Sequence, residues 1–152
     1  MVATLVLLPF FGASSVIFVR VIGSTGVAVL CSLRVLSSLG LWGLLRYESL
    51  TCTAPVVLTE SGWFESVRIT ISFGLGLHPL SLALLMAVLP VSCGVHFYSG
   101  WYLARDPHLA RFMSYISLFT GSMVLLTVGT STTVLFVGWE RIRVMSYLLI
   151  AY

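Results

Sequence analysis

Long apolar segments separated by short polar ones form the pattern of this chain. Five segments are apolar enough to form membrane helices, at about 1–19, 21–45, 77–103, 112–128 and 132–152. A helix of roughly 20 apolar residues crosses the hydrocarbon core of a bilayer, which is about 30 Å thick. The pattern therefore predicts an all-α integral membrane protein with about five transmembrane helices in a single domain.

The segment 46–76 is the longest polar interruption, and we expect it to lie outside the membrane. Within it, apolar and polar residues alternate from Ser66 to Phe73. This alternation is the period of a half-exposed β-strand. We therefore expect a short β-hairpin that lies over the membrane surface between the second and third helices.

Charged residues in the loops predict the orientation of the chain. Arg20 lies in the first loop and Arg105 and Arg111 lie in the third, whereas the loop 46–76 holds three acids and two arginines. Basic loops remain on the cytoplasmic or matrix side of a membrane. The amino terminus is therefore expected outside and, after five crossings, the carboxyl terminus inside.

Composition excludes a water-soluble globule. The chain is 59% hydrophobic and only 9% charged, whereas a soluble domain has about 25% charged residues. Its eight basic residues are all arginines, scattered along the chain, and the net charge is only +3. Nucleic-acid binding needs a clustered basic face, so we expect membrane lipids as partners and no nucleic acid.

No cofactor or metal site is predicted on this chain. Cys31, Cys52 and Cys93 are far apart, and no histidine stands at ligand spacing from them. Isolated thiols in apolar segments usually behave as small hydrophobic residues. A glycine-rich phosphate loop and a dinucleotide fingerprint are also missing from the sequence.

Glu140 is the most informative single residue, because it lies near the middle of the fifth apolar segment. A carboxylate within a membrane is costly and usually has a function. It can alternate between protonated and ionised forms as neighbouring charges approach, which a proton relay requires. Alternatively, Arg143 lies three residues further on nearly the same helix face, and the two could form a structural ion pair. Spacing alone favours neither interpretation.

His96, in the third apolar segment, is a secondary candidate. Histidine titrates near neutral pH and can carry protons. A hydrogen-bonded packing role is the more common one for a histidine in such a place.

Several blocks resemble chain 5 of the respiratory NADH:ubiquinone oxidoreductase (complex I), in the order and spacing of that family. They are His-Phe-Tyr-Ser at 96–99, Asp-Pro-His at 106–108, Arg-Phe-Met-Ser-Tyr at 111–115, Gly-Trp-Glu at 138–140 and Ser-Tyr-Leu-Leu-Ile at 146–150. The resemblance is strong from about residue 95 to 152 and weaker back to Met1. It covers the amino-terminal part of a family of antiporter-like helical subunits in the mitochondrial inner membrane or, less readily, a bacterial plasma membrane.

The resemblance implies that this chain contributes to proton translocation coupled to electron transfer from NADH to ubiquinone. Glu140 matches the family's proton-translocating glutamate. Its spacing of three residues makes Arg143 a candidate tuning partner in this chain. In the family this glutamate works against a lysine two helices later, and this chain has no lysine. The resemblance thus implies a split subunit, in which a separate chain carries the lysine and the remaining helices. Other membrane-arm subunits would be partners, and flavin, iron–sulfur clusters and quinone would lie on other subunits.

Two other interpretations remain. One is a subunit of a multi-subunit Na⁺/H⁺ antiporter, which shares the same helices. The other is a structural piece of complex I that no longer pumps, because Arg141 and Arg143 could hold the carboxylate of Glu140 in its ionised form.

Overall fold

Helices dominate the structure, a computed structural model that describes residues 2–14, 19–51, 56–66 and 69–152. In chain order the elements are α1 (Val2–Ser14), α2 (Val19–Thr51), β1 (Val56–Ser66), β2 (Ile69–Leu77), α3 (Pro79–Tyr102), α4 (Leu109–Val128) and α5 (Thr132–Ile150). A helix satisfies its own backbone hydrogen bonds, which lipid cannot do. The predicted class, a helical membrane protein with a β-hairpin between the second and third helices, is confirmed.

Three helices in the described part of the chain are long and apolar enough to cross a bilayer, at Thr25–Leu50, Pro79–Tyr102 and Leu109–Val128. Three of the five predicted membrane spans are thus found in the described residues. The described part of α1 has 13 residues, or about 20 Å at 1.5 Å per residue. The 19 residues of α5 include three charged ones. Residues 1 and 15–18 of the predicted first span lie outside the described residues.

Several predicted boundaries differ from the observed ones. The helix α2 ends at Thr51 rather than at 45, because residues 46–51 contain neither glycine nor proline to stop it. Leu77 belongs to β2 instead of the third helix, since Pro79 disfavours helical backbone at the residue before it, and His78 is extended. The helix α4 begins at Leu109, three residues before the predicted start.

One glycine divides α2. Gly23 has a φ of 77° and non-helical backbone, so the helix is interrupted there and the membrane span runs from Thr25 onward. Glycine adopts this left-handed region at little cost, because it has no Cβ.

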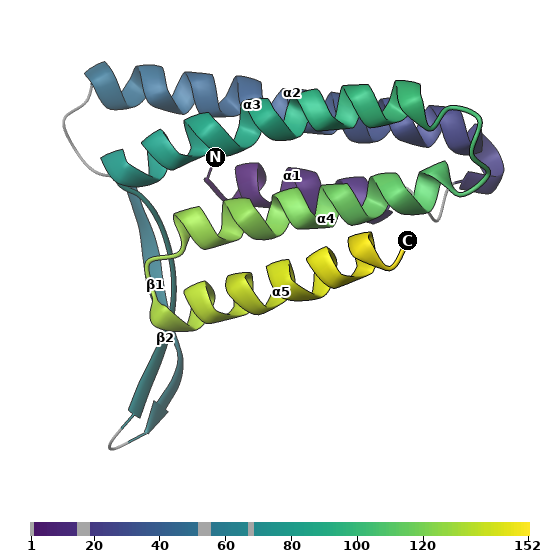
Figure 1. Ribbon diagram of the computed structural model, residues 1–152. Coiled ribbons are helices and arrows are strands. Elements are labelled where there is room, and N and C mark those ends of the chain that lie inside the picture. Colours follow the sequence, from purple (N-terminus) through teal and green to yellow (C-terminus); the bar gives the residue numbers. More distant parts are fainter. Residues whose placement is uncertain (1, 15–18, 52–55, 67–68) are drawn as a thin grey trace.

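Helices that follow one another run in opposite directions, and α4 is the centre of the bundle (Figure 1). It packs against α1, α2, α3 and α5, whereas α5 packs on α4 and touches β2. Figure 1 shows α4 between α3 and α5. The faces of α3 and α5 that pack on α4 therefore lie on opposite sides of α4.

The hairpin crosses the end of the bundle where α3 and α5 begin, and it extends beyond α5 (Figure 1). Its strands pair antiparallel, from Val56 opposite Leu77 to Ser66 opposite Ile69. They have 11 and 9 residues, longer than a short hairpin, while 67–68 lie outside the described residues. The backbone N–H of Thr130 donates to the carbonyl of Gly74 at 3.1 Å, which fastens the hairpin to the α4–α5 connection.

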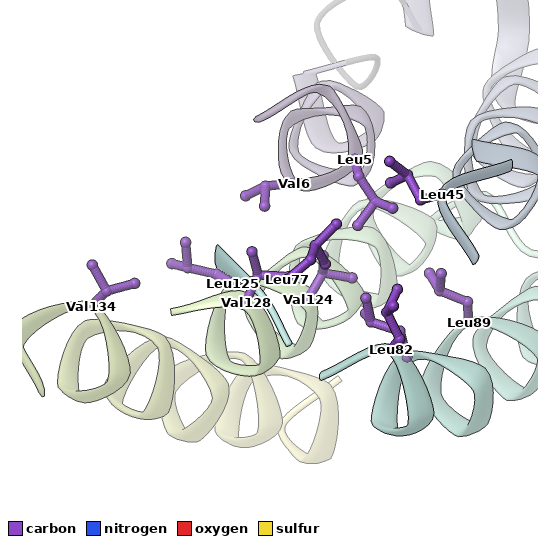
Figure 2. Close-up of a cluster of buried hydrophobic side chains, with 11 residues drawn as sticks. Leu5, Val6, Leu45, Leu77, Leu82, Leu89, Val124, Leu125, Val128 and Val134 are labelled. Carbon is purple, nitrogen blue, oxygen red and sulfur yellow. The ribbon is translucent and has the colours of Figure 1, made fainter. Parts of the chain in front are cut away.

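Two clusters of buried apolar side chains hold the bundle together. The larger lies at the hairpin end (Figure 2) and contains Leu5, Val6, Leu45, Leu77, Leu82, Leu85, Leu89, Val124, Leu125, Val128 and Val134. The smaller lies near the α3–α4 loop and contains Val27, Ala28, Cys31, Leu109, Ala110 and Met113. Each cluster joins α2 to α4, and the larger one also brings in α1, α3, α5 and the hairpin.

Candidate functional site

Close packing of α5 on α4 sets the direction of Glu140. A Cβ at Gly138 would lie 3.2 Å from both the Cα and the backbone N of Leu126, so α5 turns Gly138 toward α4. At about 100° per residue, Glu140 lies some 200° further round the helix. Its side chain therefore points away from α4 and is 41% exposed.

The carboxylate of Glu140 pairs with Arg143. The Arg143 Nη1 atom donates to Glu140 Oε1 at 3.1 Å, so the structure brings these two predicted residues together. An ion pair of this exposure contributes roughly 0–1 kcal/mol where water or polar groups reach it. A second cation can therefore displace Arg143 at modest cost.

Arg141 lies apart from this pair. Its guanidinium carbon is 4.8 Å from the centre of the Phe10 ring on α1, a cation–π contact. Arg143 is thus the arginine seen on the carboxylate, and Arg141 is directed toward α1. Of the two arginines that were expected to hold the carboxylate, only Arg143 contacts it in this structure.

His96 is completely buried between α3 and α4. Its Nδ1 lies 2.8 Å from the carbonyl oxygen of Ser92. Since a carbonyl only accepts, Nδ1 carries the proton and donates it. Nε2 then accepts from the hydroxyl of Ser117 on α4, at 3.1 Å. Both ring nitrogens are satisfied, which is how a packing histidine is held.

Other small polar side chains extend this contact. The hydroxyls of Ser92 and Thr120 lie 2.5 Å apart across α3 and α4, and the thiol of Cys31 on α2 hydrogen-bonds the side chain of Ser117. Three helices thus meet at one polar cluster, which we call the His96 cluster: Cys31, Ser92, His96, Ser117 and Thr120. It does not include Glu140, because α4 stands between α3 and α5 (Figure 1).

Sequence reasoning missed two contacts that position these residues. One is made by Arg34 of α2, whose Nη1 donates to the carbonyl of Phe11 in the last turn of α1. Carbonyls at a helix C-terminus carry partial negative charge and suit a cation. The close approach at Gly138 was also missed, although a glycine two residues before an intramembrane carboxylate is a signal that could have indicated it.

Among the described residues, no group of three or more histidines, cysteines or acids is close enough to hold a metal ion. Cys31 and Cys93 are free and buried. That the chain carries no cofactor stays a prediction.

Fold and site together define a helical membrane protein whose last described helix carries a carboxylate–arginine pair. Residues 63–113 match the family model described as NADH-Ubiquinone oxidoreductase (complex I), chain 5 N-terminus. NADH-ubiquinone oxidoreductase chain 5 of Mycosarcoma maydis is 36% identical over 100% of this chain and 23% of its own length. The chain 5 of Rhizopus stolonifer is 39% identical over 95% of this chain and 22% of its own length.

The chain is thus similar to NADH:ubiquinone oxidoreductase chain 5, and the predicted resemblance to the amino-terminal part of that family is confirmed. It spans under a quarter of the length of these two relatives. A Neurospora crassa protein named "Probable intron-encoded endonuclease 4" is also 35% identical over the whole chain, which covers 28% of that protein. The endonuclease name belongs to the longer Neurospora protein, of which this chain matches only a part.

Proposed function

We propose that this chain is a membrane-arm piece of respiratory NADH:ubiquinone oxidoreductase in the mitochondrial inner membrane, and that it contributes to proton translocation. In this proposal it is a non-redox part of the enzyme. Electrons pass from NADH to ubiquinone through flavin and iron–sulfur clusters on other subunits. The similarity to chain 5 and the three membrane-spanning helices support this assignment.

The observation that carries the proposal is the outward carboxylate of Glu140. It stands on a helix whose same side is apolar and open, with Phe136 59% and Val144 52% exposed. A charged pair facing lipid is costly, whereas one facing another helix can exchange a proton with it. The carboxylate is positioned to receive a proton and to release it when a cation approaches.

The approaching cation, in this proposal, is a lysine on one of the helices that lie outside these residues. No lysine occurs among the 152 residues, and the face of α5 opposite α4 is open to such a partner. Arg143 tunes the site by pairing with Glu140 when the lysine withdraws. His96 has a secondary role, because its cluster lies on the other side of α4.

Replacing Glu140 by Gln tests the proposal in the assembled enzyme. We expect Glu140→Gln to lose most NADH-driven proton translocation, because the amide cannot ionise. The measurement is proton uptake per NADH oxidised in coupled vesicles. Glu48→Gln is the matched control, since Glu48 is exposed near the end of α2 and its change should leave the ratio unaltered.

Unchanged pumping in Glu140→Gln would show a structural piece that no longer pumps. Proton translocation that depends on Na⁺ and does not need NADH would instead show an antiporter subunit. The chains that co-purify from membranes give a second test. Recovery without NADH-oxidising subunits would refute the assignment.

A further inference from the structure

A groove runs between α3 and α4 on the outer side of the bundle. Its volume is about 310 Å³, and its lining includes Ala87, Val91 and Val95 of α3 and Ile116, Phe119 and Met123 of α4. The polar atoms beside it are already engaged, because Ser92 donates to Thr120 and Thr120 donates to the carbonyl of Ile116. Water needs two to four polar partners in a cavity, so the groove suits an apolar occupant.

Aromatic side chains continue the groove toward the α3–α4 loop. At 100° per residue, Val91, Val95, Tyr98 and Tyr102 lie on one side of α3, and all four are exposed. The rings of Tyr98 and Tyr102 stack at 5.8 Å, and Trp101 lies 6.4 Å from Tyr98. Tyrosine and tryptophan gather where a bilayer meets water, which places this end of α3 at the level of the lipid headgroups.

Arg105 follows directly after this aromatic cluster. It is exposed and makes no hydrogen bond or ion pair within the residues that the structure describes. The neighbouring acid is occupied, since Asp106 accepts from the Tyr152 hydroxyl at 3.2 Å and from the His108 backbone N–H at 2.9 Å. A free guanidinium at headgroup level suits a phosphate, which it can bind through two parallel hydrogen bonds.

The distance between Tyr102, in the aromatic cluster, and the groove matches one lipid leaflet. Half of a 30 Å hydrocarbon core is about 15 Å, and ten helical residues also span about 15 Å. Ten residues before Tyr102 is Ser92, beside the middle of the groove. An acyl chain that begins at the level of Tyr102 would therefore end inside the groove.

We propose that the α3–α4 groove, the aromatic cluster and Arg105 together bind one anionic phospholipid. Its phosphate lies on Arg105, its glycerol region contacts Tyr98, Trp101 and Tyr102, and one acyl chain fills the groove. This site is independent of Glu140 and of proton translocation, because it lies on α3 and α4 and uses none of the charged residues of α5.

Photo-crosslinking in the assembled complex tests the proposal. The complex is reconstituted into nanodiscs with phosphatidylglycerol that carries a diazirine near the end of one acyl chain. A zwitterionic phosphatidylcholine with the same chain is the comparison. We expect phosphatidylglycerol to label peptides covering 87–95 and 116–123, about fivefold more than phosphatidylcholine does, the effect of one cation near an anionic surface.

Two arginine variants make the test specific. Arg105→Gln should reduce the phosphatidylglycerol label to the phosphatidylcholine level. Arg111→Gln removes the same charge from the same end of the bundle and should leave the label unchanged. Arg111 precedes Ile116 by five residues, which turns it about 140° from that lining residue.

A third variant tests the groove itself. Val91→Phe fills the groove without crowding the core, because Val91 is 67% exposed, and it should abolish labelling at 116–123. Equal labelling by the two lipids would overturn the proposal. An unchanged label in Arg105→Gln, or a groove shielded from lipid by a neighbouring subunit, would do so as well.

Discussion

Gly138 decides which way Glu140 faces. The missing side chain at 138 lets α5 approach the backbone of Leu126, and the helical geometry then turns the carboxylate outward. The direction of the Glu140 carboxylate is therefore set by the missing side chain of Gly138, and not by a contact between Glu140 and α4. A change at Gly138 is therefore expected to affect both stability and the position of the candidate proton site.

We predict that Gly138→Ala destabilises the chain by about 1–3 kcal/mol, the usual cost of overpacking, because its Cβ would lie 3.2 Å from backbone atoms of Leu126 and the two helices would have to move apart. The measurement is the free energy of unfolding of the full chain in bicelles during an SDS titration. Gly94→Ala is the control. A Cβ there meets nothing within 4 Å, so it should be neutral or gain up to about 1 kcal/mol of helix propensity. Equal effects of the two changes would contradict the close-packing argument.

His96→Leu should cost about 1–3 kcal/mol, since it leaves the buried hydroxyl of Ser117 without its histidine partner. The same SDS titration measures the loss. Phe97→Leu is a suitable control, because Phe97 is 53% exposed and contributes little to the core. If the complex with His96→Leu assembles to the level of the parent but translocates fewer protons, His96 is a relay residue and its packing role alone does not suffice.

At the residue scale, sequence alone predicts what lies within one helix. The Glu140–Arg143 pair follows from a spacing of three residues, because helix geometry fixes it. The partners of His96 on α4 depend on how far α3 and α4 are shifted along each other, which no local pattern specifies. The contact of Arg141 with Phe10 joins residues from opposite ends of the chain, so no local sequence pattern predicts it either.

At the scale of elements, hydrophobic pattern predicted the existence and order of every helix and of the hairpin. It was less accurate where a helix leaves the apolar layer. Polarity marks the edge of the membrane, but a helix ends only where backbone chemistry stops it, so α2 continues past Arg46. The attachment of the hairpin to Gly129 and Thr130 was not predicted, because it joins two loops that are distant in sequence.

Replacing Thr130 by Pro should loosen this attachment. Proline removes the N–H that donates to Gly74, and the extended backbone of Gly129 tolerates a following proline. We expect faster hydrogen–deuterium exchange across β2. Thr130→Ala keeps the N–H and removes the Cγ2 methyl and the Oγ1, a buried atom for which the described residues offer no hydrogen-bond partner. Hydrogen–deuterium exchange in this variant should therefore match that of the parent. Unaltered exchange in Thr130→Pro would refute the attachment.

At the scale of the whole molecule, the hairpin and the α3–α4 loop lie at opposite ends of the bundle (Figure 1). The distribution of loop charges predicts that the hairpin is outside and the loop inside. A cysteine at Phe73 and another at His108 can report the two sides, because both positions are exposed. Cys31 and Cys93 are buried, and Cys52 is replaced by Ser in both variants.

We expect a membrane-impermeant maleimide to label Phe73→Cys in sealed vesicles that keep the native orientation. His108→Cys should react only after detergent is added. Labelling in the reverse order would show that the chain is inserted the other way, and labelling of both would show that one of these segments is not separated from the other by the bilayer.

The packing of α1 on α4 can form only after α4 has been synthesised. More than a hundred residues separate the end of α1 from the end of α4, and ribosomes add about 5–20 residues per second. The first helix therefore waits roughly 5–20 s before its main partner has been made. During this interval α1 can pack on α2, whose Arg34 donates to the carbonyl of Phe11 in the last turn of α1. This contact can retain the first helix until the fourth arrives.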